Sequence, residues 1–397
     1  MKKIQLKSLF IFKSKFLKRL VAFILFLTFP LSFSSCWDYR SLDSVSIVAG
    51  IAVDVNLDNP EEYIVSYEIV VTPTGSDKGK QASILVEAKG KSINDTVKNV
   101  NKQLKLTLSF SHAEILIISE SLAKDGEIKN IIDPFLRDNE TRDNMMILVS
   151  CGETAKEILD IPEEEQIIAA FEIHKSLVND NSDANLVKIL ELYQVYNILA
   201  EGVRPLTLPT IRFLSKEDYE LTFDGMALFN GENLESFLNN EETTLFMVAD
   251  GKVTNGNFNI PFTSEDNTEK YMAISVRDST AAKKYKYNGE QFELIIDIDM
   301  LVAAVEFSKG WSGMNFPLLL ELEKQTAQLI TRNITQFILD VRNEHESDVM
   351  GFGSVIYRHD PKLWNSIKDD WSAWFKNAKI TVNCNVKITN TGVNKDF

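Results

Sequence analysis

Short apolar or alternating runs rich in β-branched residues recur along the chain and predict β-strands. In the first half, strands are predicted at Val45–Val55, Tyr63–Val71, Ile115–Ile118 and Met145–Val149. Between and after them, apolar residues at helical spacing predict helices beginning near Ser92 and Ile128, and at 163–180 and 184–200. Ser92 with Asp95 three residues later is typical of a helix start. Interleaved strands and helices predict a mixed α/β domain at residues 36–205.

The regular spacing of apolar residues weakens between Pro205 and Pro209, which predicts a domain boundary near residue 205. A strand-like stretch at Leu221–Asn230 and a short helix around Thr243–Val248 follow. Turn-forming residues at 264–267 then mark a second boundary. Residues 206–265 are therefore predicted to form a small middle domain, which needs a neighbour for stability because it is short.

The last portion predicts a C-terminal α+β domain at residues 266–397. Asn288–Gly289 is a strong hairpin signal between strands that include Tyr271–Val276 and Phe292–Phe307. The longest helical pattern runs from about Pro317 to Asn343, and Ile380–Ile388 alternates like a closing strand. The predicted fold class is α+β, with three mixed α/β domains after a cleaved lipoprotein signal peptide.

Residues 1–35 are typical of an export signal. Seven basic residues and no acidic one precede or flank an apolar run from Leu20, which Pro30 interrupts. Counted to Phe33, the run is 14 residues long, which suits a signal peptide better than a membrane span of about 20. Small residues before Cys36 resemble a bacterial lipobox, although Phe33 stands where leucine is usual. That resemblance implies lipid attachment at Cys36; an ordinary cleaved signal peptide and an uncleaved span are the alternatives.

Charge and composition narrow the function. The chain has 397 residues and a net charge of −15. Without the leader, 42 − 7 = 35 basic residues face 57 acidic ones, a net charge of −22. Such a body repels phosphate backbones, so nucleic-acid binding is not expected. Only two cysteines besides Cys36 occur, Cys151 and Cys384; a bridge between them is an open alternative, but buried free thiols are the expected outcome.

No catalytic or cofactor signature is present in the sequence. The four histidines are scattered, so no metal site is expected. His112, just before a predicted buried strand, is expected to satisfy backbone groups there. Gly351–Phe352–Gly353 lacks the third glycine of a dinucleotide site and predicts a tight turn. The tryptophans between 364 and 374 are at helical spacing and favour a core role over a sugar platform.

Taken in order, several motifs resemble those of one family, the C subunits of spore germinant receptors, known as Ger(x)C lipoproteins. The residues that match this family's motifs are distributed along the whole mature chain. They are Cys36–Arg40, Gly50–Asp54, Ser111–Glu114, Leu122–Gly126, Phe135–Asp138 with Arg142, Gly225–Phe229, Asp348–Gly353, and Pro361 with Trp364 and Trp371.

The resemblance implies a non-enzymatic, lipid-anchored subunit on the outer face of the spore inner membrane. It implies two integral membrane partners, an A and a B subunit, which respond to small nutrients. No catalytic, metal or cofactor residue is implied, and whether the body itself binds a small molecule is open. Two other readings remain: a solute-binding lipoprotein of a membrane transporter, and a surface hydrolase using an unrecognised carboxylate pair.

Overall fold

The structure is a computed structural model. It describes residues 23, 44–71, 82–152, 154–161, 167–178, 187–223, 225–251, 253, 256–263, 269–307 and 316–390. The chain divides into two compact units, Met1–Val45 and Ser46–Phe397, and the architecture below is that of the second. The predicted signal peptide at 1–35, apart from Phe23, and the predicted lipid-attachment residue Cys36 lie outside the described residues.

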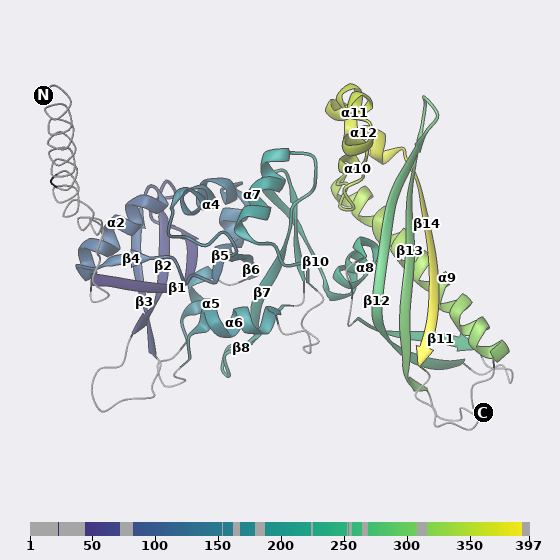
Figure 1. Ribbon diagram of the computed structural model, residues 1–397, viewed down its shortest axis with the longest axis horizontal. Coiled ribbons are helices and arrows are strands. Elements are labelled where there is room, and N and C mark those ends of the chain that lie inside the picture. Colours follow the sequence, from purple (N-terminus) through teal and green to yellow (C-terminus); the bar gives the residue numbers. More distant parts are fainter. Residues whose placement is uncertain are drawn as a thin grey trace, which may run out of the picture. The chain divides into compact units, whose positions relative to one another are not determined.

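The N-terminal half of the second unit is built on a ten-stranded sheet (Figure 1). Its main path has the order β10-β9-β7-β6-β5-β1-β2-β3. These strands are β1 (Val45–Val55), β2 (Tyr63–Val71), β3 (Ala82–Gly90), β5 (Ile115–Ser119), β6 (Met146–Ser150), β7 (Thr207–Ser215), β9 (Met226–Asn230) and β10 (Asn233–Leu238). Off this path, β4 (Thr107–Ser109) pairs with β1, and β8 (Glu220–Thr222) pairs with β7.

The centre of this sheet is parallel and fully buried. Strand β5 lies between β1 and β6, parallel to both, and β6 continues in parallel pairing to β7. All five residues of β5 and all five of β6 are buried. Parallel strands are covered on both faces, which explains why these segments are continuous apolar runs rather than alternating ones. Antiparallel pairs flank this centre on both sides.

Helices cover both faces of the sheet. Leu116 and Ile118 share one core cluster with residues of α2, α3, α4 and α7, whereas Ile115 and Ile117 share the other with residues of α5 and α6. The bounds are α2 (Ile93–Leu104), α3 (Glu120–Lys124), α4 (Ile128–Arg137), α5 (Ala155–Leu159), α6 (Ala169–Val178) and α7 (Leu192–Glu201). This division follows from the alternation of side chains along a strand. The predicted start of α2 is confirmed, since the Ser92 side chain accepts from the Asp95 N–H.

The C-terminal half contains a four-stranded sheet of order β11-β12-β13-β14. Its strands are β11 (Asn257–Thr263), β12 (Glu269–Tyr287), β13 (Phe292–Phe307) and β14 (Lys379–Asn390). The predicted hairpin is confirmed: Gly289 has a φ of 98°, and the Asn288 side chain accepts from the backbone N–H of Gln291 at 2.8 Å. Strand β14 pairs in parallel with β13 after a long helical connection.

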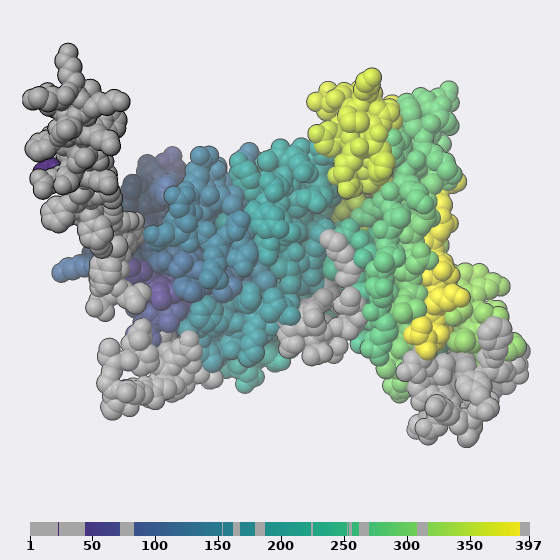
Figure 2. All heavy atoms as spheres, in the orientation of Figure 1, coloured from purple at the N-terminus to yellow at the C-terminus, as the bar shows by residue number. Residues whose placement is uncertain are grey.

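That connection consists of α9 (Phe316–His345), α10 (Phe352–His359), α11 (Pro361–Ile367), the 3-10 helix η4 (Lys368–Asp370) and α12 (Trp371–Lys376). The long helix α9 contacts β14, and its predicted apolar face is confirmed by buried Leu322, Ile334 and Ile338. Helix α10 contacts β12, and Figures 1 and 2 show the yellow C-terminal helices against the green strands.

The segment predicted as a middle domain is divided among neighbours. Its predicted strand stretch forms β8 and β9, and β9 pairs with β7 of the large sheet. Helix α8 (Asn240–Asp250) contacts α9, β12 and β10. The predicted α+β class is confirmed by the two sheets with their helices. The three-domain division, with boundaries near 205 and 265, stays a prediction.

Candidate functional site

Several motifs that the sequence singled out meet around one cleft with a volume of 660 Å³. Its walls are the end of α7, residues 202–205, the β9–β10 turn, residues 344–348 and the segment from Lys368 to Phe375. Phe229, Asp348 and Trp371, which lie far apart in sequence, all line it. The motifs that contain Phe229, Asp348 and Trp371 therefore meet at this cleft.

The cleft is acidic. Among the described residues, six carboxylate side chains line it against two cationic ones, Arg204 and Lys368. The six are Glu232, Glu235, Glu344, Glu346, Asp348 and Asp369. Partial burial raises the pKa of Glu235, and Glu346 raises it further, whereas His345 opposes the shift. Such a lining favours cationic groups and disfavours anionic ones.

Asp348 organises one end of the cleft. Its Oδ2 accepts from the backbone N–H of Gly353 at 2.7 Å and from the Trp371 Nε1–H at 3.2 Å. Burial raises the pKa of Asp348 to about 6, against the lowering effect of these hydrogen bonds. The predicted tight turn is confirmed at Gly351, whose φ of 71° is left-handed. Gly353 instead is the second residue of α10, where a Cβ atom would lie 2.8 Å from the Trp364 ring.

The tryptophans form a structural cluster. Trp364 is buried, and its ring meets that of Trp371 edge-on at 5.5 Å. Trp371 and Trp374 both contact Phe292 of β13, at ring separations of 5.8 and 5.7 Å. Edge-to-face packing of this kind stabilises a core. The interpretation of these residues as core rather than a sugar platform therefore agrees with their burial and ring contacts.

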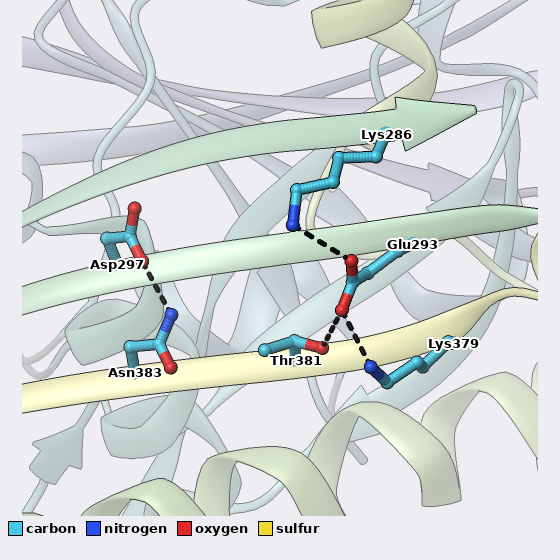
Figure 3. Close-up of polar contacts among 6 residues, drawn as sticks. All are labelled: Lys286, Glu293, Asp297, Lys379, Thr381 and Asn383. Carbon is cyan, nitrogen blue, oxygen red and sulfur yellow. Dashed lines mark hydrogen bonds and ion pairs between the residues drawn. The ribbon is translucent and has the colours of Figure 1, made fainter. Parts of the chain in front are cut away.

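A row of carboxylates along β13 is neutralised by its neighbours. Figure 3 shows Glu293 accepting from Lys286, Lys379 and Thr381, while Asp297 accepts from the amide of Asn383. Hydrogen bonds from Lys379, Lys286 and Thr381 lower the pKa of Glu293 to about 2. A general acid needs a raised pKa. These carboxylates serve instead as cross-strand partners on a solvated face.

The histidines lie apart and have ordinary partners. His174 Nε2 lies 3.3 Å from a Glu114 carboxylate oxygen, and His359 Nδ1 lies 2.8 Å from the Val355 carbonyl oxygen. The expected hydrogen bonds from His112 to backbone groups at the strand entry are absent among the described residues: His112 is exposed, because the turn at Phe110–Ala113 places it on the surface. In the described ranges, no cluster of three or more potential ligands could hold a metal ion.

The motif ending at Asp54 has a structural role that the sequence did not reveal. The Asp54 carboxylate lies in β1 and accepts from the first two N–H groups of α5, at 2.8 and 2.9 Å. Glu68 in β2 does the same for α6, also at 2.8 and 2.9 Å. Burial raises the pKa of both side chains. Each buried carboxylate thus ties a helix start to the sheet.

Neither Cys151 nor Cys384 forms a disulfide, and both are half-buried rather than fully buried as expected. Burial raises the pKa of the Cys384 thiol to about 12, so it is not a reactive thiolate. Among the helices that the structure describes, none is long and apolar enough to cross a membrane.

Comparison with known sequences defines the class. The family profile described as "Spore germination protein N-terminal domain" matches residues 38–213. The profile described as "Spore germination B3/ GerAC like, C-terminal" matches residues 224–392. Together they extend over most of the chain in the expected order. The chain therefore belongs to the Ger(x)C family of spore germination proteins, the C subunits of spore germinant receptors.

Relatives from Bacillus subtilis (strain 168) align along nearly their whole length. Spore germination protein KC is 21% identical, with 90% of this chain and 92% of that protein covered. Spore germination protein A3 is 24% identical, with 90% and 94% covered. A solved structure, titled "Crystal Structure of the GerBC protein", matches with a TM-score of 0.57 at 16% identity, covering 89% of this chain and 100% of that one. It supports the same fold.

Proposed function

We propose that the protein is the lipid-anchored C subunit of a nutrient germinant receptor, without catalytic activity of its own. It assembles with two integral membrane subunits, A and B, on the outer face of the spore inner membrane and helps trigger germination. The observation that carries this proposal is the ordered match of both family profiles along residues 38–392.

The leader and the charge of the body support this arrangement. In the proposal, Cys36 carries a diacylglyceryl group and an N-acyl chain, and such multiple acylation gives stable anchoring. The acidic body then stands off anionic lipid, and its acidic cleft faces basic segments of the partners. Complementary potentials of this kind favour association and specificity.

Affinity capture of the tagged protein from spore membranes tests the assembly. Two co-purifying multi-span proteins are expected, present in comparable amounts. Capture of the intact lipoprotein without any multi-span partner, under detergents that preserve membrane complexes, contradicts the proposal.

The anchor is tested separately with Cys36→Ala, and Cys151→Ala serves as the matched control because it also removes one thiol and Cys151 forms no disulfide. Spores carrying Cys36→Ala are expected to germinate poorly with nutrients, whereas Cys151→Ala spores germinate normally. Normal germination of Cys36→Ala spores, at normal receptor levels, would rule out the anchor.

A further inference from the structure

A second, smaller cavity of 140 Å³ carries the opposite charge to the acidic cleft. Its walls come from residues 204–207, from α8, from β12 and from α10. Among the described residues that line it, four side chains are cationic and one, Asp250, is a carboxylate. The four are Lys188, Arg204, Lys283 and Arg358. This local excess of positive charge is notable in a chain with a net charge of −15.

Two of these cations pair with Asp250. The Lys283 Nζ lies 2.7 Å from Asp250 Oδ1, and the Lys188 Nζ lies 3.2 Å from Asp250 Oδ2. Their side chains are only 13 to 16% exposed. Lys283 also interacts electrostatically with Asp348. Both ammonium groups are therefore held at the cavity wall in a poorly hydrated place, where their attraction for an anion is little screened.

The other two cations, Arg204 and Arg358, have N–H groups available for hydrogen bonds to a ligand. Arg358 uses its Nε–H for the Ser354 carbonyl oxygen at 3.2 Å. Within the described part of the chain, neither Arg204 nor Arg358 forms an ion pair with a carboxylate. Unpaired guanidinium groups beside a cavity are suited to oxyanions, because their planar fork matches two oxygens at once.

Thr207 gives independent evidence for a ligand. It is 1% exposed and lines the same cavity. Its hydroxyl group has no hydrogen-bond partner among the described residues. Buried hydroxyl groups are nearly always hydrogen-bonded, so an orphan one next to a cationic cavity suggests a missing acceptor.

We propose that this cavity binds one small oxyanion, of the class that includes inorganic phosphate. Lys188 and Lys283 supply a positive electrostatic potential. Arg204 and Arg358 donate hydrogen bonds to the oxyanion, and the Thr207 hydroxyl group donates another. The cavity volume of 140 Å³ corresponds to about four or five water molecules, which suits a phosphate-sized group rather than a nucleotide. This inference goes beyond the proposed function and does not depend on it.

Binding of the anion would join elements that are distant in sequence. Residues 204–207 lead into β7, whereas Lys283 belongs to β12 and Arg358 to α10. An oxyanion that contacts all three neutralises their mutual repulsion and adds charge-assisted hydrogen bonds between them. The bound protein is therefore expected to unfold at a higher temperature than the free one.

Equilibrium dialysis of the full-length protein in detergent against radiolabelled phosphate, at constant ionic strength, tests the site. Saturable binding near one anion per chain is expected. The double variant Arg204→Gln/Arg358→Gln should weaken it at least about tenfold, because it removes the charge-assisted hydrogen bonds of both guanidinium groups. The matched control is Arg332→Gln, which removes an exposed arginine that does not line the cavity.

Thr207→Val provides a near-isosteric variant that changes no charge and should weaken binding several-fold. A normal unfolding midpoint without phosphate shows that each variant is folded. The proposal is overturned if binding is not saturable, if the double arginine variant binds as tightly as the original chain, or if Arg332→Gln loses as much affinity. Competition by short-chain phosphatidic acid separates the two sources of phosphate: displacement admits a lipid head group, and its failure restricts the site to free anions.

Discussion

Replacing Gly353 by alanine has two opposing effects on the free energy of unfolding: higher helix propensity raises it, and steric conflict with neighbouring side chains lowers it. Gly353 lies inside α10, where alanine is ordinarily better than glycine by about 0.5–1 kcal/mol. A Cβ atom at this position, however, would lie 2.8 Å from Trp364 Cη2 and 3.1 Å from Trp371 Nε1. Real Cβ atoms do not approach so closely, so the rings would have to move.

Moving either the Trp364 or the Trp371 ring would lower stability, because both are held by several contacts. Trp371 donates to Asp348 at 3.2 Å and packs edge-on against Phe292, while Trp364 is held between Trp371 and the core. Overpacking of this kind costs about 1–3 kcal/mol, and loss of the Trp371–Asp348 hydrogen bond adds about 1 kcal/mol. After subtraction of the propensity gain, we expect Gly353→Ala to lower the free energy of unfolding by about 1–3 kcal/mol.

Urea unfolding followed by tryptophan fluorescence measures this change, with equal slopes confirming comparable transitions. The matched comparison is Gly353→Ala in a Trp364→Leu background, where space is available for the new methyl group. There the alanine is expected to be neutral or stabilising, giving a coupling free energy of at least about 1 kcal/mol. A stabilised Gly353→Ala single variant, or additive effects in the double variant, would refute the steric argument.

Four further substitutions have definite expected outcomes. Because burial raises the pKa of Asp348 to about 6, its contribution to stability is complete below its ordinary pKa of 3.8 and is lost as the pH rises through 6. The stability advantage of the original chain over Asp348→Asn, measured by urea unfolding, should therefore shrink between pH 4 and pH 7; a constant difference contradicts this. Gly225→Ala would place Cβ 2.7 Å from the Leu238 carbonyl oxygen and should cost more than Gly231→Ala, up to about 3 kcal/mol. Gly231→Ala, where nothing lies within 4 Å, should cost about 1 kcal/mol from its positive φ alone; equal losses in the two glycine variants would exclude a steric cause. Glu235→Lys should reduce co-purification of the membrane subunits without lowering the unfolding midpoint, and unchanged capture would remove the acidic cleft from the proposed interface.

Local patterns predicted the elements well because their causes are local. The buried strand at Ile115–Ile118, the helix beginning near Ile128 and the Asn288–Gly289 hairpin depend on residues that are neighbours in sequence, and the structure confirms all three. Buried carboxylates were missed for the opposite reason. Glu68 stands in an otherwise apolar strand, and only the distant start of α6 explains its burial.

The small basic cavity could not be predicted from the sequence. Lys188 precedes α7, Asp250 ends α8 and Lys283 lies in β12, where alternating lysines resemble a solvated strand face. Nothing in their spacing indicates that they meet. The acidic cleft is only partly predictable from the sequence. The motifs that contain Phe229, Asp348 and Trp371 can be identified there, but only the fold brings them together around one cavity.

The β9–β10 hairpin has a consequence for how members of this family can recombine. It pairs with β7 through Thr207–Pro209, yet it lies within residues 224–392, which the C-terminal family profile matches. A chimaera joined at residues 214–223 would therefore complete the large sheet with a hairpin from the other parent. Such a chimaera should fold only when β7 of one parent can pair and pack with β9 of the other. The pairing of Thr207–Pro209 with Met226–Leu228 therefore limits which halves can be exchanged between relatives.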